Sequence, residues 1–274
     1  MIFQSHGVSR CIEHETLRST LSADGTRIAF ERWGDGPPIV FVVGAFNDRT
    51  TAQPLARLLT PEFTVITYDR RGRGASGDTA PFAIEREIED LETLIDEAGG
   101  SAAAFGFSSG ALLALRAAAR GLPIRKMALY DPPFGVLANR GGEPVDHAAQ
   151  LAELVAAGRR GDAVEYFQSV IVGIPLEVVA QLRHASFRPA LEAIAHTLVY
   201  DAAIVNDRTL PAVLQLVRVP TLIMSGGSNP PELQNAAAAL VHDLSDARLR
   251  TLEGRTHDIV PEIMAPVMRE FLAT

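Results

Sequence analysis

Residues 106–110 read Gly106-Phe107-Ser108-Ser109-Gly110. A short apolar run at 102–105 precedes this stretch, and a run rich in alanine and leucine follows it at 111–119. That order predicts a strand, a sharp turn and a helix. A serine with a glycine two residues to either side fits a nucleophile elbow, in which the glycines leave room for crowded backbone. Ser108 is therefore the candidate nucleophile.

Length and composition indicate a globular chain with a sizeable core. A chain of 274 residues can form one large α/β domain or two smaller ones, and can bury roughly three quarters of its unfolded surface. Its 25 basic and 33 acidic side chains give a net charge of −8 and are interspersed. This charge pattern gives no reason to expect nucleic acid or an anionic membrane as a partner.

The cysteine content and the N-terminal residues indicate the cellular compartment. A single cysteine, Cys11, cannot form an internal disulfide and is weak support for a metal site. The first residues lack the charged and apolar regions of a secretory signal, and no apolar run reaches the roughly 18 residues of a membrane span. We therefore expect a cytoplasmic protein that needs no metal or other cofactor and acts on a small molecule. Its assembly is open, and a homodimer is one alternative.

Short apolar runs alternate with helical patterns along the chain, which predicts a mostly parallel sheet of about eight strands with helices on both faces. The predicted strands are 16–21, 27–33, 39–43, 64–68, 102–105, 126–130, 221–224 and 248–252. The first two are expected to form a hairpin through Asp24-Gly25. The periodic residues 84–98 predict a helix before the strand that leads to Ser108.

About ninety residues separate the strands at 126–130 and 221–224, and they contain helical patterns at 147–157, 162–172, 176–184 and 189–200. This predicts a helical cap at 134–217, inserted between core segments 1–133 and 218–274, where substrate would be selected. A separate helical domain without a catalytic part is the alternative. The predicted inner face comprises Phe134, Val136, Leu137, Tyr166, Phe167, Ile171, Leu198 and Tyr200. It suits an apolar or aromatic substrate group, although such periodic residues commonly only pack together.

A glycine-rich segment follows the strand at 64–68 and reads Asp69-Arg70-Arg71-Gly72-Arg73-Gly74-Ala75-Ser76-Gly77. It lacks the lysine and hydroxyl residue that end a phosphate-binding P-loop, and its glycine spacing is not that of a dinucleotide site. The segment is therefore interpreted as a structural turn.

Four features occur in the order typical of one family: Val43-Gly44-Ala45-Phe46, the segment 69–76, the Ser108 elbow, and Gly254-Arg255-Thr256-His257-Asp258. From about residue 16 to residue 272 the sequence resembles a lid-bearing α/β-hydrolase of the serine-nucleophile branch. The resemblance implies the α/β-hydrolase fold and a catalytic triad. It also implies an oxyanion hole formed by the backbone N–H groups of Ala45 and Ser109.

A serine hydroxyl is a weak nucleophile at neutral pH and needs a positioned base, for which imidazole has a suitable pKa. The sequence contains seven histidines. Of these, His257 lies in a glycine-containing loop between a predicted strand and the last predicted helix. His257 is therefore the candidate general base.

The acid departs from the common pattern of the superfamily, which usually carries an aspartate after the penultimate strand. Asn229 stands at that position. An amide cannot stabilise the imidazolium by charge, and such a change costs ~10⁴ in rate in a serine protease. Asp131, at the end of the predicted strand 126–130, is the candidate acid, because some members place theirs there. Glu232 and Asp258 are the alternatives, and Asp131 before two prolines also fits a simple turn.

A serine at the elbow argues against the haloalkane dehalogenase and epoxide hydrolase branches, which use an aspartate there. The leading hypothesis is hydrolysis of an ester, lactone or thioester through an acyl-serine intermediate. A cofactor-free perhydrolase, a carbon–carbon bond hydrolase or an acyltransferase on the same site is one alternative. A non-catalytic ligand-binding protein, suggested by Asn229, is the other.

Overall fold

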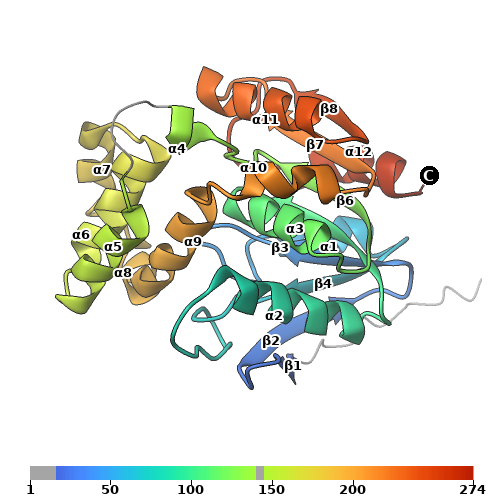
Figure 1. Ribbon diagram of the computed structural model, residues 1–274, viewed down its shortest axis with the longest axis horizontal. Helices are drawn as coiled ribbons and strands as arrows, with labels where there is room; N and C mark the ends of the chain where they lie inside the picture. The colour runs from blue at the N-terminus through green and yellow to red at the C-terminus, as the bar shows by residue number, and fades with distance from the viewer. Residues whose placement is uncertain (1–16, 140–144, 274) are drawn as a thin grey trace, which may run out of the picture.

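The computed structural model describes residues 17–139 and 145–273 (Figure 1). Cys11, the first residue of the predicted strand 16–21 and part of the predicted cap lie outside these ranges. An eight-stranded sheet has the order β1-β2-β4-β3-β5-β6-β7-β8. The strands are β1 (Arg18–Leu21), β2 (Arg27–Trp33), β3 (Pro38–Val42), β4 (Thr64–Tyr68), β5 (Ala102–Phe107), β6 (Ile124–Tyr130), β7 (Thr221–Gly226) and β8 (Ala247–Leu252).

Strand directions agree with the predicted α/β-hydrolase fold. β1 pairs antiparallel with β2 as the expected hairpin, and β2 pairs antiparallel with β4. From β4 through β3, β5, β6 and β7 to β8, neighbouring strands are parallel. Because connections in a parallel sheet are helices that cover both faces, the central strands are apolar on both sides. All five residues of β4 are buried, for example. The mostly parallel sheet of about eight strands is therefore confirmed.

Helices cover the two faces of the sheet and form two apolar cores (Figure 1). On one face lie α2 (Ile84–Glu97), α3 (Ser109–Ala119) and α11 (Pro231–Asp243), packed against alternate residues of the strands. On the other face lie α1 (Gln53–Leu59) and α12 (Pro261–Ala273). The central strands β3 to β7 each contribute to both cores, as the period of two residues requires.

The described residues between β6 and β7 are mostly helical. Its elements are α4 (Val136–Asn139), α5 (His147–Ala156), α6 (Arg160–Tyr166), the π-helix Phe167–Val172, α7 (Leu176–Leu182), α8 (Arg188–Ala193), the 3₁₀ turn Ala195–Thr197, α9 (Leu198–Val205), α10 (Leu210–Val213) and the 3₁₀ turn Leu214–Leu216. We call this segment the β6–β7 insertion. Figure 1 shows α5 to α8 grouped to one side of the sheet.

The β6–β7 insertion has an apolar core of its own, which includes Leu151, Val164, Phe167 and Leu198. Its last part differs: Leu210 and Leu214 pack into the core on the α3 face of the sheet. The patterns 162–172 and 189–200 are each broken. The first ends as a π-helix, and the second is interrupted by the 3₁₀ turn Ala195–Thr197. Among the helices of the described chain, none combines the length and apolar composition needed to cross a lipid bilayer.

Candidate active site

Ser108 stands at a sharp turn between β5 and α3, as the sequence predicts. Its backbone has φ +56° and ψ −128°, a left-handed conformation that is rare for a residue with a side chain. The flanking glycines leave room for the backbone of α3 and β3, which lies close to this turn. A Cβ on Gly106 would lie 2.6 Å from the Cα of Ala111, and one on Gly110 would lie 2.2 Å from the carbonyl oxygen of Val42. The turn therefore presents the half-buried Ser108 hydroxyl above the end of the sheet.

Asp131 and His257 meet at the carboxyl end of the sheet. Asp131 follows β6, is completely buried and has φ +46°. Its Oδ2 lies 3.2 Å from Nδ1 of His257, which comes from the loop between β8 and α12. The backbone N–H of Asp131 donates to the Met224 carbonyl at 3.0 Å, so the next strand fixes the position of the carboxylate.

Asn229 binds the carboxylate from the loop after β7. Its Nδ2 donates to Oδ1 of Asp131 at 2.8 Å, and the backbone N–H of Gly226 donates to the same oxygen at 3.1 Å. One carboxylate oxygen is thus held by the β7 loop, and the other faces His257. The residue at the usual acid position is a hydrogen-bond donor to an acid on the neighbouring strand.

The two alternative acids lie elsewhere. Glu232, in the first turn of α11, and Asp258 are both exposed, and Asp258 accepts a hydrogen bond from the Thr256 hydroxyl at 3.0 Å. In the part of the chain that the structure describes, Asp131 is the carboxylate in contact with the His257 ring.

His257 is also placed by an aromatic contact. Its ring centroid lies 4.8 Å from that of Phe107, the residue before Ser108. Its side chain is 39% exposed, so a substrate can reach it. Over residues 17–139 and 145–273, no hydrogen bond joins the imidazole to the Ser108 hydroxyl. Such bonds are often long in unliganded enzymes and shorten when substrate binds.

The two predicted oxyanion donors are neighbours. Gly44, before Ala45, lies so close to the elbow that a Cβ there would be 2.8 Å from Cβ of Ser108. Ser109 is the first residue of α3, where backbone N–H groups have no partner within the helix. The N–H of Ala45 donates to the Ser109 hydroxyl oxygen at 3.1 Å. A substrate oxygen would therefore share this N–H with the Ser109 hydroxyl.

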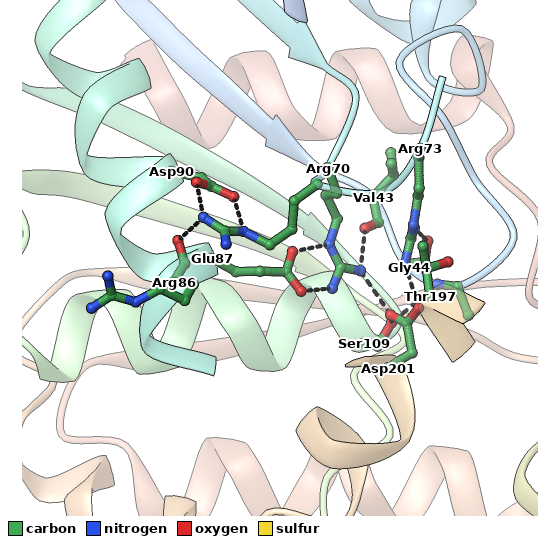
Figure 2. A network of polar contacts seen from close by, with 12 residues as sticks. Val43, Gly44, Arg70, Arg73, Arg86, Glu87, Asp90, Ser109, Thr197 and Asp201 are labelled. Atoms are coloured by element: carbon green, nitrogen blue, oxygen red, sulfur yellow. Dashed lines mark hydrogen bonds and ion pairs between the residues drawn. The ribbon is translucent and has the colours of Figure 1, made fainter. Parts of the chain in front are cut away.

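The loop after β4 contributes buried charge that the sequence interpretation missed. Arg70 and Arg73 are each 1% exposed. Arg70 pairs with Glu87 of α2 through two contacts of 2.6 Å, and both arginines contact Asp201 of α9 (Figure 2). The segment is a turn, as interpreted, but its arginine side chains enter the protein. A signal was available: Glu87 lies on the same face of α2 as the buried Ile88 and Leu91.

Electrostatics keeps Asp201 ionised. Burial acts to raise its pKa, but the charges of Arg70 and Arg73 outweigh that effect and hold the pKa below its usual value. Burial likewise acts to lower the pKa of Arg70, and the charges of Asp201 and Glu87 raise it well above its usual value. The buried groups are therefore paired ions.

The predicted inner face of the cap is mainly packing. Most of its residues belong to the core of the β6–β7 insertion, and Phe134 belongs to the core on the α3 face. Tyr200 stacks on Phe82 with ring centroids 4.0 Å apart. Phe167 reaches the loop after β3, where its ring meets that of Phe46 edge-on at 5.3 Å.

Comparisons with known proteins add family information. The model of the alpha/beta hydrolase family matches residues 39–268. The solved structure of an alpha/beta hydrolase from Sphaerobacter thermophilus is 48% identical, with a TM-score of 0.85 over 93% of this chain and 100% of that chain. N-formylmaleamate deformylase of Pseudomonas putida is 27% identical over 213 residues, which are 76% of this chain and 77% of the deformylase. Polyketide synthase ThaQ of Burkholderia thailandensis is 28% identical over 264 residues, which are 90% of this chain but only 12% of the synthase.

Proposed function

The chain belongs to the alpha/beta hydrolase family, and from this membership we propose that it is a serine hydrolase that cleaves an ester, lactone or thioester of a small, largely apolar substrate. The observation that carries the proposal is the contact of 3.2 Å between Asp131 and His257, next to a serine on a strained elbow. Ser108 is the proposed nucleophile, His257 the base and Asp131 the acid.

In the first step, the Ser108 hydroxyl oxygen attacks the substrate carbonyl carbon while Nε2 of His257 takes the serine proton. Asp131 accepts from Nδ1 of His257, which favours the tautomer whose Nε2 is free to act as a base. The imidazolium then gives its proton to the leaving oxygen or sulfur, and an acyl-serine remains.

In the second step, His257 activates a water molecule that attacks the acyl carbon and releases the acid. In both steps, negative charge develops on the carbonyl oxygen. The N–H groups of Ala45 and Ser109 are the proposed donors to it, and loss of one such donor typically costs ~10²–10³ in turnover.

We assign substrate selection to the β6–β7 insertion. The edge contact of Phe167 with Phe46 brings this segment onto the loop that carries Ala45, and Ala45 itself packs against the core of the insertion. An apolar wall of this kind suits an apolar acyl or alcohol group better than a charged one.

The amide bond of a small substrate is the second candidate for the bond that is cleaved. The chain is similar to N-formylmaleamate deformylase over 76% of its length. The same acyl-serine steps serve an amide if His257 protonates the leaving nitrogen.

Asn229, at the usual position of the acid, is the feature that favours the alternative of a ligand-binding protein without catalysis. In the structure, however, the Asn229 amide donates a hydrogen bond to Asp131, the carboxylate that contacts His257. The proposed triad therefore has its acid, which supports an enzyme. Burying a carboxylate beside a histidine carries a desolvation cost, and such arrangements are typical of catalytic sites.

The test is hydrolysis of p-nitrophenyl esters of increasing chain length by the wild type and by Ser108→Ala. We expect the wild type to turn over the shorter esters, and the variant to lose turnover by ~10⁶, as in serine hydrolases that lose their nucleophile. A small N-formyl amide, measured in parallel, separates the two candidate bonds. Turnover that survives in Ser108→Ala would contradict the proposal.

A further inference from the structure

Asp201 is an aspartate of α9 whose side chain is completely buried against the elbow helix. Its Oδ1 accepts hydrogen bonds from the Ser109 hydroxyl and from Nη1 of Arg70, both at 2.7 Å. Its Oδ2 accepts from Nη2 of Arg73. Figure 2 shows these contacts converging on the one carboxylate. The β6–β7 insertion thus places a charge beside the residue that follows the proposed nucleophile.

The two arginines continue from Asp201 to the loop after β3. Nη1 of Arg70 donates to the Val43 carbonyl at 3.2 Å, and Nη1 of Arg73 donates to the Gly44 carbonyl at 2.6 Å (Figure 2). A trans peptide is planar, with its C=O and N–H pointing in opposite directions. Fixing the Gly44 carbonyl therefore fixes the direction of the next N–H, that of Ala45.

Ser109 closes the arrangement from the other side. Its hydroxyl donates to Asp201 and accepts from the Ala45 N–H, so one side chain touches both the carboxylate and the loop. Its own backbone N–H is the second proposed oxyanion donor. Both proposed donors are thus tied to Asp201, one through Arg73 and one through the Ser109 side chain.

The charges around Asp201 are balanced. Arg70 and Arg73 are the cations, Asp201 and Glu87 the anions, and none of the four side chains is more than 1% exposed. Replacing Asp201 by a neutral residue leaves two buried cations with one anion. The guanidinium groups must then move apart, and the carbonyl oxygens they hold must move with them.

We infer that Asp201 is a positioning residue, supplied by the β6–β7 insertion, that fixes the backbone N–H groups of Ala45 and Ser109 for the oxyanion of the reaction. This inference rests on the proposed serine mechanism. It makes the insertion part of the catalytic arrangement as well as a wall for the substrate.

The experiment measures how fast a fluorophosphonate labels Ser108 in the wild type, Asp201→Asn and Asp90→Asn. In labelling, the serine oxygen forms a bond to phosphorus, the P–F bond breaks, fluoride leaves and His257 takes the serine proton. Negative charge grows on the phosphoryl oxygen, so the rate reports on the oxyanion donors without requiring the natural substrate.

Asp90→Asn is the matched control. Asp90 is 1% exposed and binds Arg71 of the same loop through contacts of 2.6 and 2.8 Å. The other partners of Arg71 are Asp24 and the Arg86 carbonyl, so this pair does not touch the loop after β3. Each variant removes one buried negative charge, and a fall in melting temperature is expected in both.

In Asp201→Asn, we expect labelling to slow about 10- to 100-fold, below the 10²–10³ for outright loss of a donor. On an ester, kcat should fall by a similar factor while KM stays within about threefold, because ground-state binding does not use the displaced donors. Asp90→Asn should keep labelling and kcat within about threefold of the wild type. Equal losses in the two variants, or none in Asp201→Asn, would overturn the inference.

Ser109→Ala provides a second variant that leaves the four buried charges intact and should fold. It removes one tie to Asp201, and we expect labelling to slow about five- to tenfold. If its labelling rate equals that of the wild type, the inference is wrong even where Asp201→Asn does not fold. Where the wild type is labelled and Ser108→Ala is not, the label is assigned to Ser108. If the wild type itself is not labelled, the proposed serine mechanism fails instead of this inference.

Discussion

At the scale of single residues, Asp131 is the proposed acid, and Asn229 stands where the superfamily usually carries that acid. The carboxylate sits at the end of β6, and the amide at the end of β7 donates to it at 2.8 Å. Both side chains point to the same place because neighbouring parallel strands end side by side. The geometry at His257 therefore depends on two residues, and each can be tested separately.

The first prediction concerns the acid. Asp131→Asn should lower kcat by about 10⁴, because an amide neither stabilises the imidazolium nor imposes the productive tautomer. Kinetics on a p-nitrophenyl ester measure this loss. Asp258→Asn and Glu232→Gln are the controls and should stay near wild type, since both side chains are exposed and away from His257. If kcat fell by ~10³ in one of the controls while Asp131→Asn stayed active, the carboxylate of that control would be the acid instead of Asp131.

The second prediction concerns Asn229→Asp. A second carboxylate would lie about as close to Asp131 as the amide does now, 2.8 Å, and two such groups cannot both ionise easily. The pair should retain a proton to a higher pH, which weakens the stabilisation of the imidazolium. An imidazolium that is stabilised less loses its proton at lower pH, so we expect the acid limb of the kcat/KM profile to shift to lower pH. An unchanged profile would mean that the two side chains separate in the variant.

Sequence reasoning could identify some of these residues and not others. Ser108 and His257 stand in short motifs with glycines, and Asp131 follows a recognisable strand. Asp201 has no such motif: it occurs within an ordinary helix and meets Ser109 across 92 residues of sequence. Contacts of this range depend on how the β6–β7 insertion folds back, which no local pattern encodes.

At the scale of elements, the elbow is held by backbone packing. Val42 at the end of β3 lies against the first turn of α3, and only a residue without a side chain fits at Gly110. The strand, turn and helix were predictable because the two glycines, the apolar run and the alanine-rich run are all local. The helices of the β6–β7 insertion were less predictable, because apolar periodicity continues across the breaks before and after the 3₁₀ turn Ala195–Thr197.

The third prediction follows from this packing. In Gly110→Ala, the new Cβ would lie 2.2 Å from the Val42 carbonyl oxygen, which is backbone and cannot swing aside. We expect a loss of about 3 kcal/mol in the free energy of unfolding, measured by chemical denaturation. Gly77→Ala is the matched control, because its Cβ would meet atoms no closer than 3.5 Å. A change within about 1 kcal/mol is expected there.

At the scale of the whole molecule, buried ion pairs join segments far apart in the chain. The loop after β4 binds α2 through Glu87 and Asp90, the hairpin through Asp24, and the β6–β7 insertion through Asp201. The sheet order and its helical layers were predictable, because hydrophobic runs define them. The ion pairs were not, since a charged residue in a helical pattern is ordinarily assigned to solvent.

The fourth prediction is a pH dependence of stability. Burial acts to raise the pKa of Asp24, but hydrogen bonds from Arg71 and Thr26 outweigh it and hold the pKa well below its usual value. A carboxylate with a lowered pKa stabilises the fold fully above its unfolded pKa of about 3.9, and this contribution is lost as the pH falls below that value. We expect the free energy of unfolding to fall progressively below about pH 5, and most steeply below about pH 4.

The matched variant for this prediction is Asp24→Asn. It removes the titrating group, so its stability should be lower at pH 7 and should fall less steeply on acidification. Thermal unfolding followed by circular dichroism at several pH values measures both slopes. Equal slopes in the wild type and the variant would assign the acid sensitivity to other carboxylates.

The position of Asp201 also limits which β6–β7 insertions from related proteins could replace the one in this chain. Ser108 and Asp131 both precede the β6–β7 insertion, so exchange of that segment for one from a relative would leave the proposed nucleophile and the proposed acid in place. If the transplanted segment lacks a carboxylate at the place of Asp201, Arg70 and Arg73 lose their shared counter-ion in the protein interior. Exchange of this segment therefore preserves the buried ion pairs only when the donor segment carries a carboxylate at that place.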